Sequence, residues 1–152
     1  MMVGVHSSAL VRGVLGAGLI GFVAGCTTAP VAPTCVHRNL EVEQAIGYCE
    51  ALRSGDVLYI SGVTGAGPME SAVPKVYQAL ADILKSSGLS FRDVVKENVY
   101  ATDLDAFIAN NDKRKPFFGD QAPSATWVQV QRLFRPAYVL EVELVARYPT
   151  VR

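Results

Sequence analysis

The segment from Tyr138 to Tyr148, "YVLEVELVARY", constrains the fold more than any other part of the sequence, because its apolar residues alternate along it. Side chains of a β-strand point alternately to the two faces of a sheet. A strand here would present one wholly apolar face and one face that mixes apolar side chains with carboxylates. The pattern therefore predicts a sheet with one face packed on a core. The apolar set is Leu140, Val142, Leu144 and Ala146, and the mixed set is Val139, Glu141, Glu143 and Val145.

Other segments also predict strands. Residues 56–62, "DVLYISG", and residues 125–133, "ATWVQVQRL", are rich in β-branched and aromatic residues. Residues 93–102, "DVVKENVYAT", favour a strand with Val95, Glu97 and Val99 on one face. The glycine-rich stretch "GVTGAGP", which overlaps the end of the strand over residues 56–62, predicts a loop.

Two segments show helical periodicity. Residues 70–88 predict a helix that Ser71 caps and Gly88 ends, and residues 103–119 predict a second helix that is interrupted near Pro116. With a further strand before residue 56, the order is strand, strand, helix, strand, helix, strand, strand. This order predicts an α+β fold in which a mixed sheet carries two helices on one face.

The N-terminus predicts a segment that is removed from the folded protein. Arg12 precedes an acid-free apolar run from Gly13 to Gly25, which is typical of a signal peptide. Its thirteen residues would span about 20 Å as a helix, less than the roughly 30 Å of a bilayer's hydrocarbon core. The run ends in "VAGC", which resembles the bacterial lipobox. We therefore predict a lipoprotein signal peptide over residues 1–25 and lipidation of Cys26, with ordinary secretion as the alternative.

The predicted domain order follows from this processing. Residues 26–35 would be the lipidated cysteine and a Pro- and Thr-containing tether, and residues 36–152 the folded domain. Thr27 occupies the position where an Asp would resemble an inner-membrane retention signal. The predicted location is therefore the cell envelope, facing the periplasm and anchored to the outer membrane.

Charge argues against nucleic acid as a partner. Removing residues 1–25 removes Arg12 and no acid, which leaves 13 of the 14 basic residues against 14 acidic ones, a net charge of −1. The densest basic cluster is "KRK" at residues 113–115, a run typical of a solvated helix face. Nucleic-acid binding requires a larger cluster of cations to replace the counterions of the phosphates.

Two cysteines and one histidine remain in the predicted domain and tether. Cys35 and Cys49 either form a disulfide in an oxidising periplasm or remain free thiols. His37 is far in sequence from His6, which leaves with the signal peptide. The sequence predicts no metal site and no Ser-His-Asp arrangement.

Four passages together form a specific pattern in their order and spacing. They are "GYCEALRSGDVLYISG", "ADILKSSGLSFRDVVKENVYATDLDAF", "FFGDQAPSA" and "RPAYVLEVELVA", and they extend from about Glu43 to Ala146. The pattern resembles the reactive intermediate deaminase family, also called the YjgF family. The resemblance implies a chorismate-mutase-like α+β subunit, a homotrimer with clefts between subunits, hydrolysis of enamines or imines, and no metal or organic cofactor.

The resemblance also implies the residues of the site. Tyr48, Ser61 and Glu141 match positions assigned to catalysis, with Glu141 orienting the attacking water, and Gly62 follows Ser61 as in the family. An iminium carbon is already electrophilic, so the reaction requires a positioned water and an acceptor for its proton. Without the resemblance, Glu141 would be interpreted as part of a solvent-facing stripe.

One position departs from the family pattern. The family's deaminases hold the substrate carboxylate with an arginine in a "P-A-R-S" motif, and this sequence has Pro123 to Thr126, "PSAT", with Ala125 at the arginine's position. Thr126 and Trp127 follow it on the predicted substrate-binding strand. Arg132 and Arg135 lie downstream, and nothing in the sequence brings either to the cleft.

Two hypotheses of function follow. The first is a lipid-anchored trimeric enzyme that hydrolyses a small imine-like or other substrate with Tyr48, Ser61 and Glu141, without an arginine to hold a substrate carboxylate. The second is a non-catalytic periplasmic trimer that binds a small ligand or a partner through a cleft lined by Tyr48 and Trp127. A ribonuclease, an activity sometimes attributed to the family, agrees least with the near-neutral charge.

Overall fold

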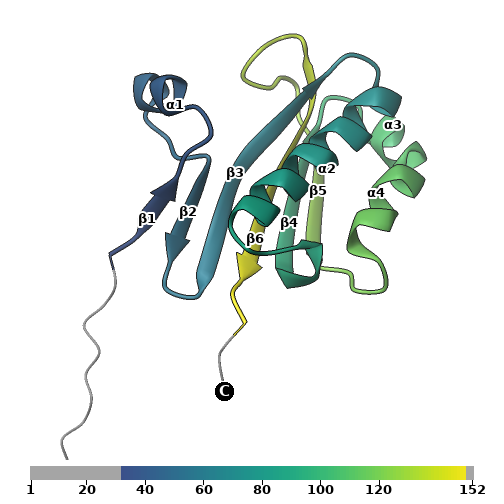
Figure 1. The fold of residues 1–152 in the computed structure, drawn as a ribbon. Helices are drawn as coiled ribbons and strands as arrows, with labels where there is room; N and C mark the ends of the chain where they lie inside the picture. The colour runs from purple at the N-terminus through teal and green to yellow at the C-terminus, as the bar shows by residue number, and fades with distance from the viewer. Residues whose placement is uncertain (1–31, 150–152) are drawn as a thin grey trace, which may run out of the picture.

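The computed structural model describes residues 32–149. The predicted signal peptide, Cys26 and the tether up to Val31 lie outside these residues. The described chain forms one sheet with helices packed on one of its faces (Figure 1). The predicted α+β class is confirmed.

The sheet has six strands in the order β1-β2-β3-β6-β4-β5. β4 and β5 are parallel, and all other neighbours are antiparallel, so the sheet is mixed as predicted. β6 lies in the interior of the sheet between β3 and β4, which agrees with its strict alternation. The strands are β1 (Thr34–Val36), β2 (Ala51–Ser54), β3 (Val57–Ala66), β4 (Val94–Ala101), β5 (Ser124–Gln129) and β6 (Tyr138–Arg147).

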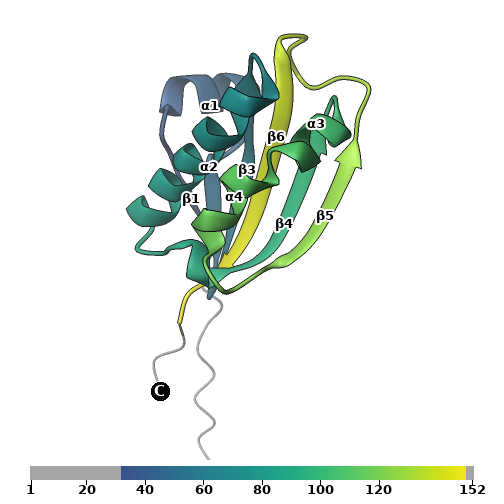
Figure 2. The ribbon, with the colours of Figure 1, turned by 90° about the vertical axis from the view of Figure 1, so that its right-hand side faces the viewer.

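Three of the helices cover one face of the sheet. These are α2 (Met69–Ser86), α3 (Leu104–Ala109) and α4 (Asn111–Phe118), and Figure 2 shows them together on the same side. α1 (Leu40–Ile46) lies at the end of β1 and β2 instead (Figure 1). The core between sheet and helices contains the buried residues Leu58, Val73, Tyr77, Leu80, Leu84, Phe107, Val142 and Leu144. Within residues 32–149, no helix lies on the opposite face of the sheet.

The glycine-rich segment predicted as a loop is part of β3, and this prediction was wrong. β3 continues through residues 62–66 and pairs with β6 up to Ala66. A Cβ at Gly65 would approach Val76 Cγ2 to 2.8 Å and Ala72 Cβ to 3.1 Å. Gly65 therefore lets α2 pack closely on the strand, which is a tertiary requirement for glycine that sequence patterns attribute to turns.

β4 begins with an irregularity that reverses one predicted orientation. The pairing of β4 with β6 shifts between Val94 and Lys96. Val94 is buried and Val95 is exposed, whereas Glu97 and Val99 are buried. Val95 therefore does not share a face with Glu97 as predicted, because an extra residue in a strand inverts the alternation on one side of it.

The helix boundaries also differ from the prediction. The segment 103–119 forms two helices that meet at Asn110, and Pro116 lies inside the second. α2 begins at Met69, so Ser71 lies within the first turn and its hydroxyl donates to the carbonyl of Pro68. Gly88 follows the C-terminus of α2 with φ of 73°, as its predicted role requires.

Paired structure starts inside the predicted tether. β1 begins at Thr34 and pairs with β2, so Thr34 and Cys35 belong to the sheet although the predicted domain starts at residue 36. Cys35 and Cys49 form a disulfide, with their Cα atoms 5.5 Å apart. The bond closes a loop that begins within the edge strand β1 and contains the whole of α1.

We expect the disulfide to be a major source of stability for this part of the fold. Replacing Cys35 and Cys49 by Ser should lower the free energy of unfolding by about 3 kcal/mol, because the unfolded chain then regains the freedom of a loop of this size. Urea-induced unfolding measures this change. Reductant should destabilise the wild type to the same level and leave the double variant unchanged, and equal stability of the oxidised and reduced wild type would contradict the expectation.

Candidate functional site

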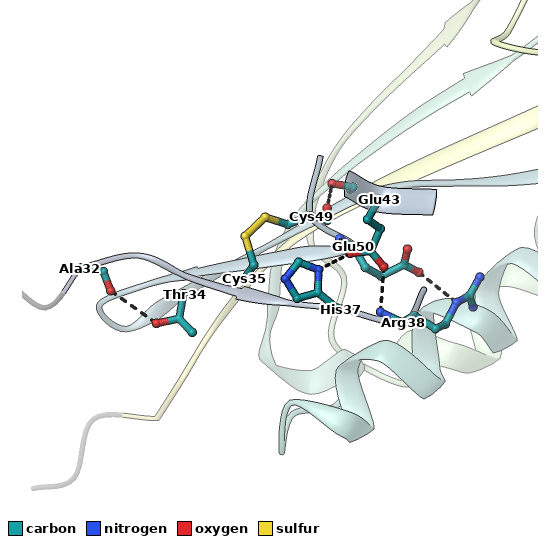
Figure 3. The surroundings of a disulfide bond; sticks show 9 residues. Ala32, Thr34, Cys35, His37, Arg38, Glu43, Cys49 and Glu50 are labelled. Atoms are coloured by element: carbon teal, nitrogen blue, oxygen red, sulfur yellow. Dashed lines mark hydrogen bonds and ion pairs between the residues drawn. A yellow bond between two sulfur atoms is a disulfide. The ribbon is translucent and has the colours of Figure 1, made fainter. Parts of the chain in front are cut away.

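A buried carboxylate organises the chain on either side of α1. Glu43 is 1% exposed and accepts hydrogen bonds from the backbone N–H groups of Arg38 and Asn39, both at 2.8 Å, and of Glu50 at 3.2 Å. His37 Nδ1 lies 2.6 Å from the same carboxylate (Figure 3). Glu43 therefore connects the residues that precede α1 with those that follow it.

The hydrogen bonds also set the charge of this carboxylate. Burial alone raises the pKa of Glu43, but the N–H groups and His37 outweigh it and lower the pKa to about 2. Glu43 is therefore ionised at neutral pH and keeps all its acceptors available. A neutral Glu43 would leave buried N–H groups without a strong acceptor.

The chain that leaves α1 is joined directly to β3. The hydroxyl of Ser61 donates to the carbonyl of Cys49 at 2.6 Å, and the N–H of Ser61 donates to the carbonyl of Glu50 at 3.0 Å. These bonds place Tyr48, next in the chain, beside Ser61. They also use the hydroxyl hydrogen of Ser61, so its oxygen remains as an acceptor toward the cleft.

A second irregularity of the sheet brings Glu141 to the same place. The pairing of β3 with β6 shifts between Ile60 and Val63, at Ser61 and Gly62. A Cβ on Gly62 would lie 2.0 Å from Glu141 Oε1. Glycine at position 62 is therefore required by the carboxylate of Glu141, which occupies the space that any larger residue would fill.

These residues line one cleft of about 450 Å³. It contains four of the predicted site residues, namely Tyr48, Ser61, Gly62 and Glu141. The remaining lining residues are Val42, Ile46, Thr64, Phe134, Arg135 and Tyr138. The cleft thus combines a carboxylate, two phenols, a guanidinium and an apolar wall, which is a composition suited to a small polar molecule with an apolar part.

The environment of the cleft raises the pKa of two of its groups. Burial first, and the charge of Glu143 second, raise the pKa of Glu141. Burial also raises the pKa of Tyr48, followed by the charges of Glu50 and Glu43. A carboxylate with a raised pKa is a stronger base than an ordinary one, and Tyr48 keeps its proton and can donate a hydrogen bond.

The predicted residues on β5 lie elsewhere in the described chain. Ala125 and Trp127 are on the helix-covered side of the edge strand, in register with Glu97 and Val99 of β4. Thr126 is on the other side, where its hydroxyl accepts from Lys96 Nζ at 2.7 Å. None of the three lines the cleft that contains Tyr48.

Trp127 belongs to a buried polar cluster. Its indole N–H donates to Glu97 Oε2 at 3.0 Å, and its ring packs edge-on against Phe107 with centroids 5.1 Å apart. Glu97 is fully buried and also accepts from Tyr77 at 2.7 Å and from Arg114 at 2.6 Å. Within one chain, Trp127 therefore packs between sheet and helices rather than beside Tyr48.

Arg135 is the residue of the cleft that sequence reasoning missed. It follows β5 in an irregular connection, and no periodicity places such a residue. Its guanidinium carbon lies 6.0 Å from the ring centroid of Tyr138, which also lines the cleft. The sequence contained one signal, because Arg135 is one of two arginines in the connection to the strand that carries Glu141.

Residues 32–149 contain no group of three or more His, Cys, Asp and Glu side chains arranged to hold a metal ion. Over the same residues, none of the helices combines the length and the apolar character needed to cross a membrane.

Comparison with known proteins identifies the family. A family model described as Endoribonuclease L-PSP matches residues 39–148. The chain belongs to this family. A 2-iminobutanoate/2-iminopropanoate deaminase of Capra hircus is similar to this chain, 35% identical over 112 residues, which are 67% of this chain and 81% of the relative. A RutC family protein of Pyrococcus horikoshii is 29% identical over 108 residues, which are 65% of this chain and 85% of that relative.

Comparison with solved structures shows a similar fold. A YjgF family protein of Mycobacterium tuberculosis is 27% identical with a TM-score of 0.70, and the match covers 76% of this chain and 99% of that protein. The predicted YjgF-like fold and the resemblance to this family are therefore confirmed.

The raised pKa of Glu141 can be measured directly. We expect NMR titration of the side-chain carboxyl groups to give a pKa for Glu141 above the ordinary value of a glutamate. Glu143→Gln should lower the pKa of Glu141, because it removes the neighbouring negative charge. Glu70→Gln, which removes an exposed carboxylate outside the cleft, is the matched control and should leave the pKa of Glu141 unchanged. A pKa of Glu141 at or below the ordinary value of a glutamate would refute this account of the cleft.

Proposed function

We propose that this protein hydrolyses small enamines or imines in the cleft formed by Tyr48, Ser61 and Glu141, and that it does so at the cell envelope on a lipid anchor. The observation that carries the proposal is that these residues line one cleft although they lie on separate elements. Tyr48 follows α1, Ser61 belongs to β3 and Glu141 belongs to β6. Family membership and the deaminase named among the relatives support the reaction class.

The cleft contains the groups that imine hydrolysis requires. Water adds to the iminium carbon and forms the new C–O bond, while Glu141 accepts the proton that the water loses. Glu141 then returns this proton to the nitrogen of the carbinolamine. The C–N bond breaks, ammonia leaves, and the hydroxyl proton released as the carbonyl forms protonates the ammonia. The products are an oxo compound and ammonium.

The other residues of the cleft would orient the reactants. The Ser61 oxygen, whose hydrogen is bound to the Cys49 carbonyl, accepts a hydrogen bond from the substrate nitrogen or the water. Tyr48 provides a ring wall and a protonated hydroxyl. Gly62 allows the carboxylate of Glu141 to approach the strand. Positioning of this kind accounts for a large part of the rate enhancement in reactions of this type.

A second candidate is a ligand-binding protein without catalysis. It is favoured by Ala125, which stands where the family resemblance expects the arginine that holds the substrate carboxylate. It is also favoured by Trp127, a bulky and partly buried side chain two positions along the strand from Ala125. The assay below separates the two candidates.

We further propose that three copies assemble around the helix-free face of the sheet. This face exposes Tyr59 and Val128, which are 48% and 37% exposed in the single chain. An exposed sheet face with large apolar side chains indicates a surface that a partner covers. In such an assembly Thr126, which lies on the helix-free side of β5, would belong to a cleft between subunits. Sedimentation should give three times the chain's mass, and a monomer at micromolar concentration would contradict this part of the proposal.

The location in the envelope is supported by two features. The N-terminal sequence ends its apolar run in the lipobox-like "VAGC". The disulfide between Cys35 and Cys49 is of the kind that persists in oxidising compartments such as the periplasm. The proposed address is the outer membrane, with the domain facing the periplasm.

The reaction is tested by ammonia release from imines generated in the assay. The full-length protein, purified in detergent, should accelerate ammonia release from 2-iminobutanoate, and Glu141→Gln should reduce kcat by at least about 100-fold because the proton acceptor is lost. Ala125→Arg should raise turnover further if its side chain reaches a cleft in the assembly. A wild type without activity on carboxylate-bearing and uncharged imines would leave only the ligand-binding candidate.

The lipid anchor is tested by labelling. Cells that express the full-length protein should incorporate radiolabelled palmitate into it and retain it in the outer-membrane fraction. Cys26→Ala should abolish both, because acylation requires the thiol of this residue. Cys49→Ala, which removes a different thiol, is the control and should still be labelled. Labelling that survives in Cys26→Ala would overturn the proposed anchor.

A further inference from the structure

We propose that Arg135 binds the carboxylate of the substrate in the cleft that contains Tyr48 and Glu141, in place of the arginine that is absent at position 125. This inference rests on the proposed function and adds the residue that would hold the substrate, Arg135, which lines the cleft. Three observations support the inference. Hydrogen bonds hold the connection that contains Arg135, its guanidinium forms no ion pair within residues 32–149, and the other residues of the cleft suit a small carboxylate.

The connection between β5 and β6 is held in a defined shape. Leu133 is buried, and the guanidinium of Arg132 donates to the carbonyls of Leu133 and Phe134, both at 3.2 Å. The N–H of Tyr138 donates to the carbonyl of Arg135 at 3.0 Å and closes a turn immediately before β6. Arg135 therefore lines the cleft from a turn that these hydrogen bonds hold in place.

The charge of Arg135 has no counterion among residues 32–149. Over these residues the ion pairs of arginines involve Arg38, Arg114 and Arg147, and none involves Arg135. Its guanidinium lies near the ring of Tyr138, which leaves its N–H groups available. A guanidinium with free donors in a small cleft is suited to a carboxylate, which it can bind with two parallel hydrogen bonds.

The rest of the cleft determines which carboxylate fits. Arg135 and Glu141 line the same cleft, so an anionic ligand is attracted by the first and repelled by the second. A 2-imino acid satisfies both, because its carboxylate is bonded directly to the electrophilic carbon. With the carboxylate on Arg135, that carbon and its attacking water face Glu141. The exposed apolar residues Val42, Ile46 and Phe134 provide a wall for the substrate's side chain.

Substitution of Arg135 in the full-length protein tests the inference. Arg135→Ala should raise KM for 2-iminobutanoate at least tenfold while kcat changes less than twofold, since the carboxylate contact is the same in the ground state and the transition state. Arg135→Lys should recover part of the loss, because it keeps the charge without the fork. Arg92→Ala removes an exposed arginine that does not line this cleft, and it is the matched control with unchanged KM.

Calorimetry of the product separates this inference from the proposed function. 2-Oxobutanoate should bind the wild type at least tenfold more tightly than Arg135→Ala, while the methyl ester of 2-oxobutanoate should bind both equally. An active wild type whose Arg135→Ala variant behaves like Arg92→Ala overturns the inference and leaves the proposed function. An inactive wild type that binds 2-oxobutanoate through Arg135 supports the carboxylate site and overturns the proposed reaction. If the wild type neither hydrolyses 2-iminobutanoate nor binds 2-oxobutanoate, both the inference and the proposed function are overturned.

Discussion

The site depends on one buried carboxylate. Glu43 accepts three backbone N–H groups and faces His37, so it fixes the chain on both sides of α1 at once. An ionised group at this depth is stable only because every acceptor is used, and the cost of its burial is thereby offset. The disulfide and the two bonds of Ser61 act on the same segment. Together they make the position of Tyr48 a property of the fold.

β3 contributes residues to both the core and the cleft. Gly65 allows α2 to pack on one face, and Gly62 gives room to the carboxylate of Glu141 on the other. The shift in pairing between Ile60 and Val63 permits this division, because an irregularity reorients the residues on one side of it. The glycines of this segment are therefore explained by the close approach of other groups. On the helix-covered face, a second buried carboxylate, Glu97, is satisfied by Arg114, Tyr77 and Trp127.

Much of the fold was predictable because it follows from local periodicity. The alternation of β6, the helical spacing of α2 and the glycine after it all agree with the structure. The errors lie where a contact distant in sequence decides the conformation. A glycine-rich segment is a strand because a helix packs against it, and Val95 changes face because the pairing with β6 shifts. β1 and α1 were not predicted, since a short edge strand and a seven-residue helix carry little periodic signal.

For the candidate site, the sequence by itself determined the chemical groups: a tyrosine, a Ser-Gly pair and a glutamate in a recognisable order, with an alanine where an arginine was expected. Only the tertiary structure decided which of them meet. It joins Tyr48, Ser61, Gly62 and Glu141 in one cleft, adds Arg135 to it, and turns Trp127 toward Glu97 instead. The physical reason is that side-chain type is a local property, whereas a cleft is formed by the register of strands and by hydrogen bonds between residues far apart in the chain.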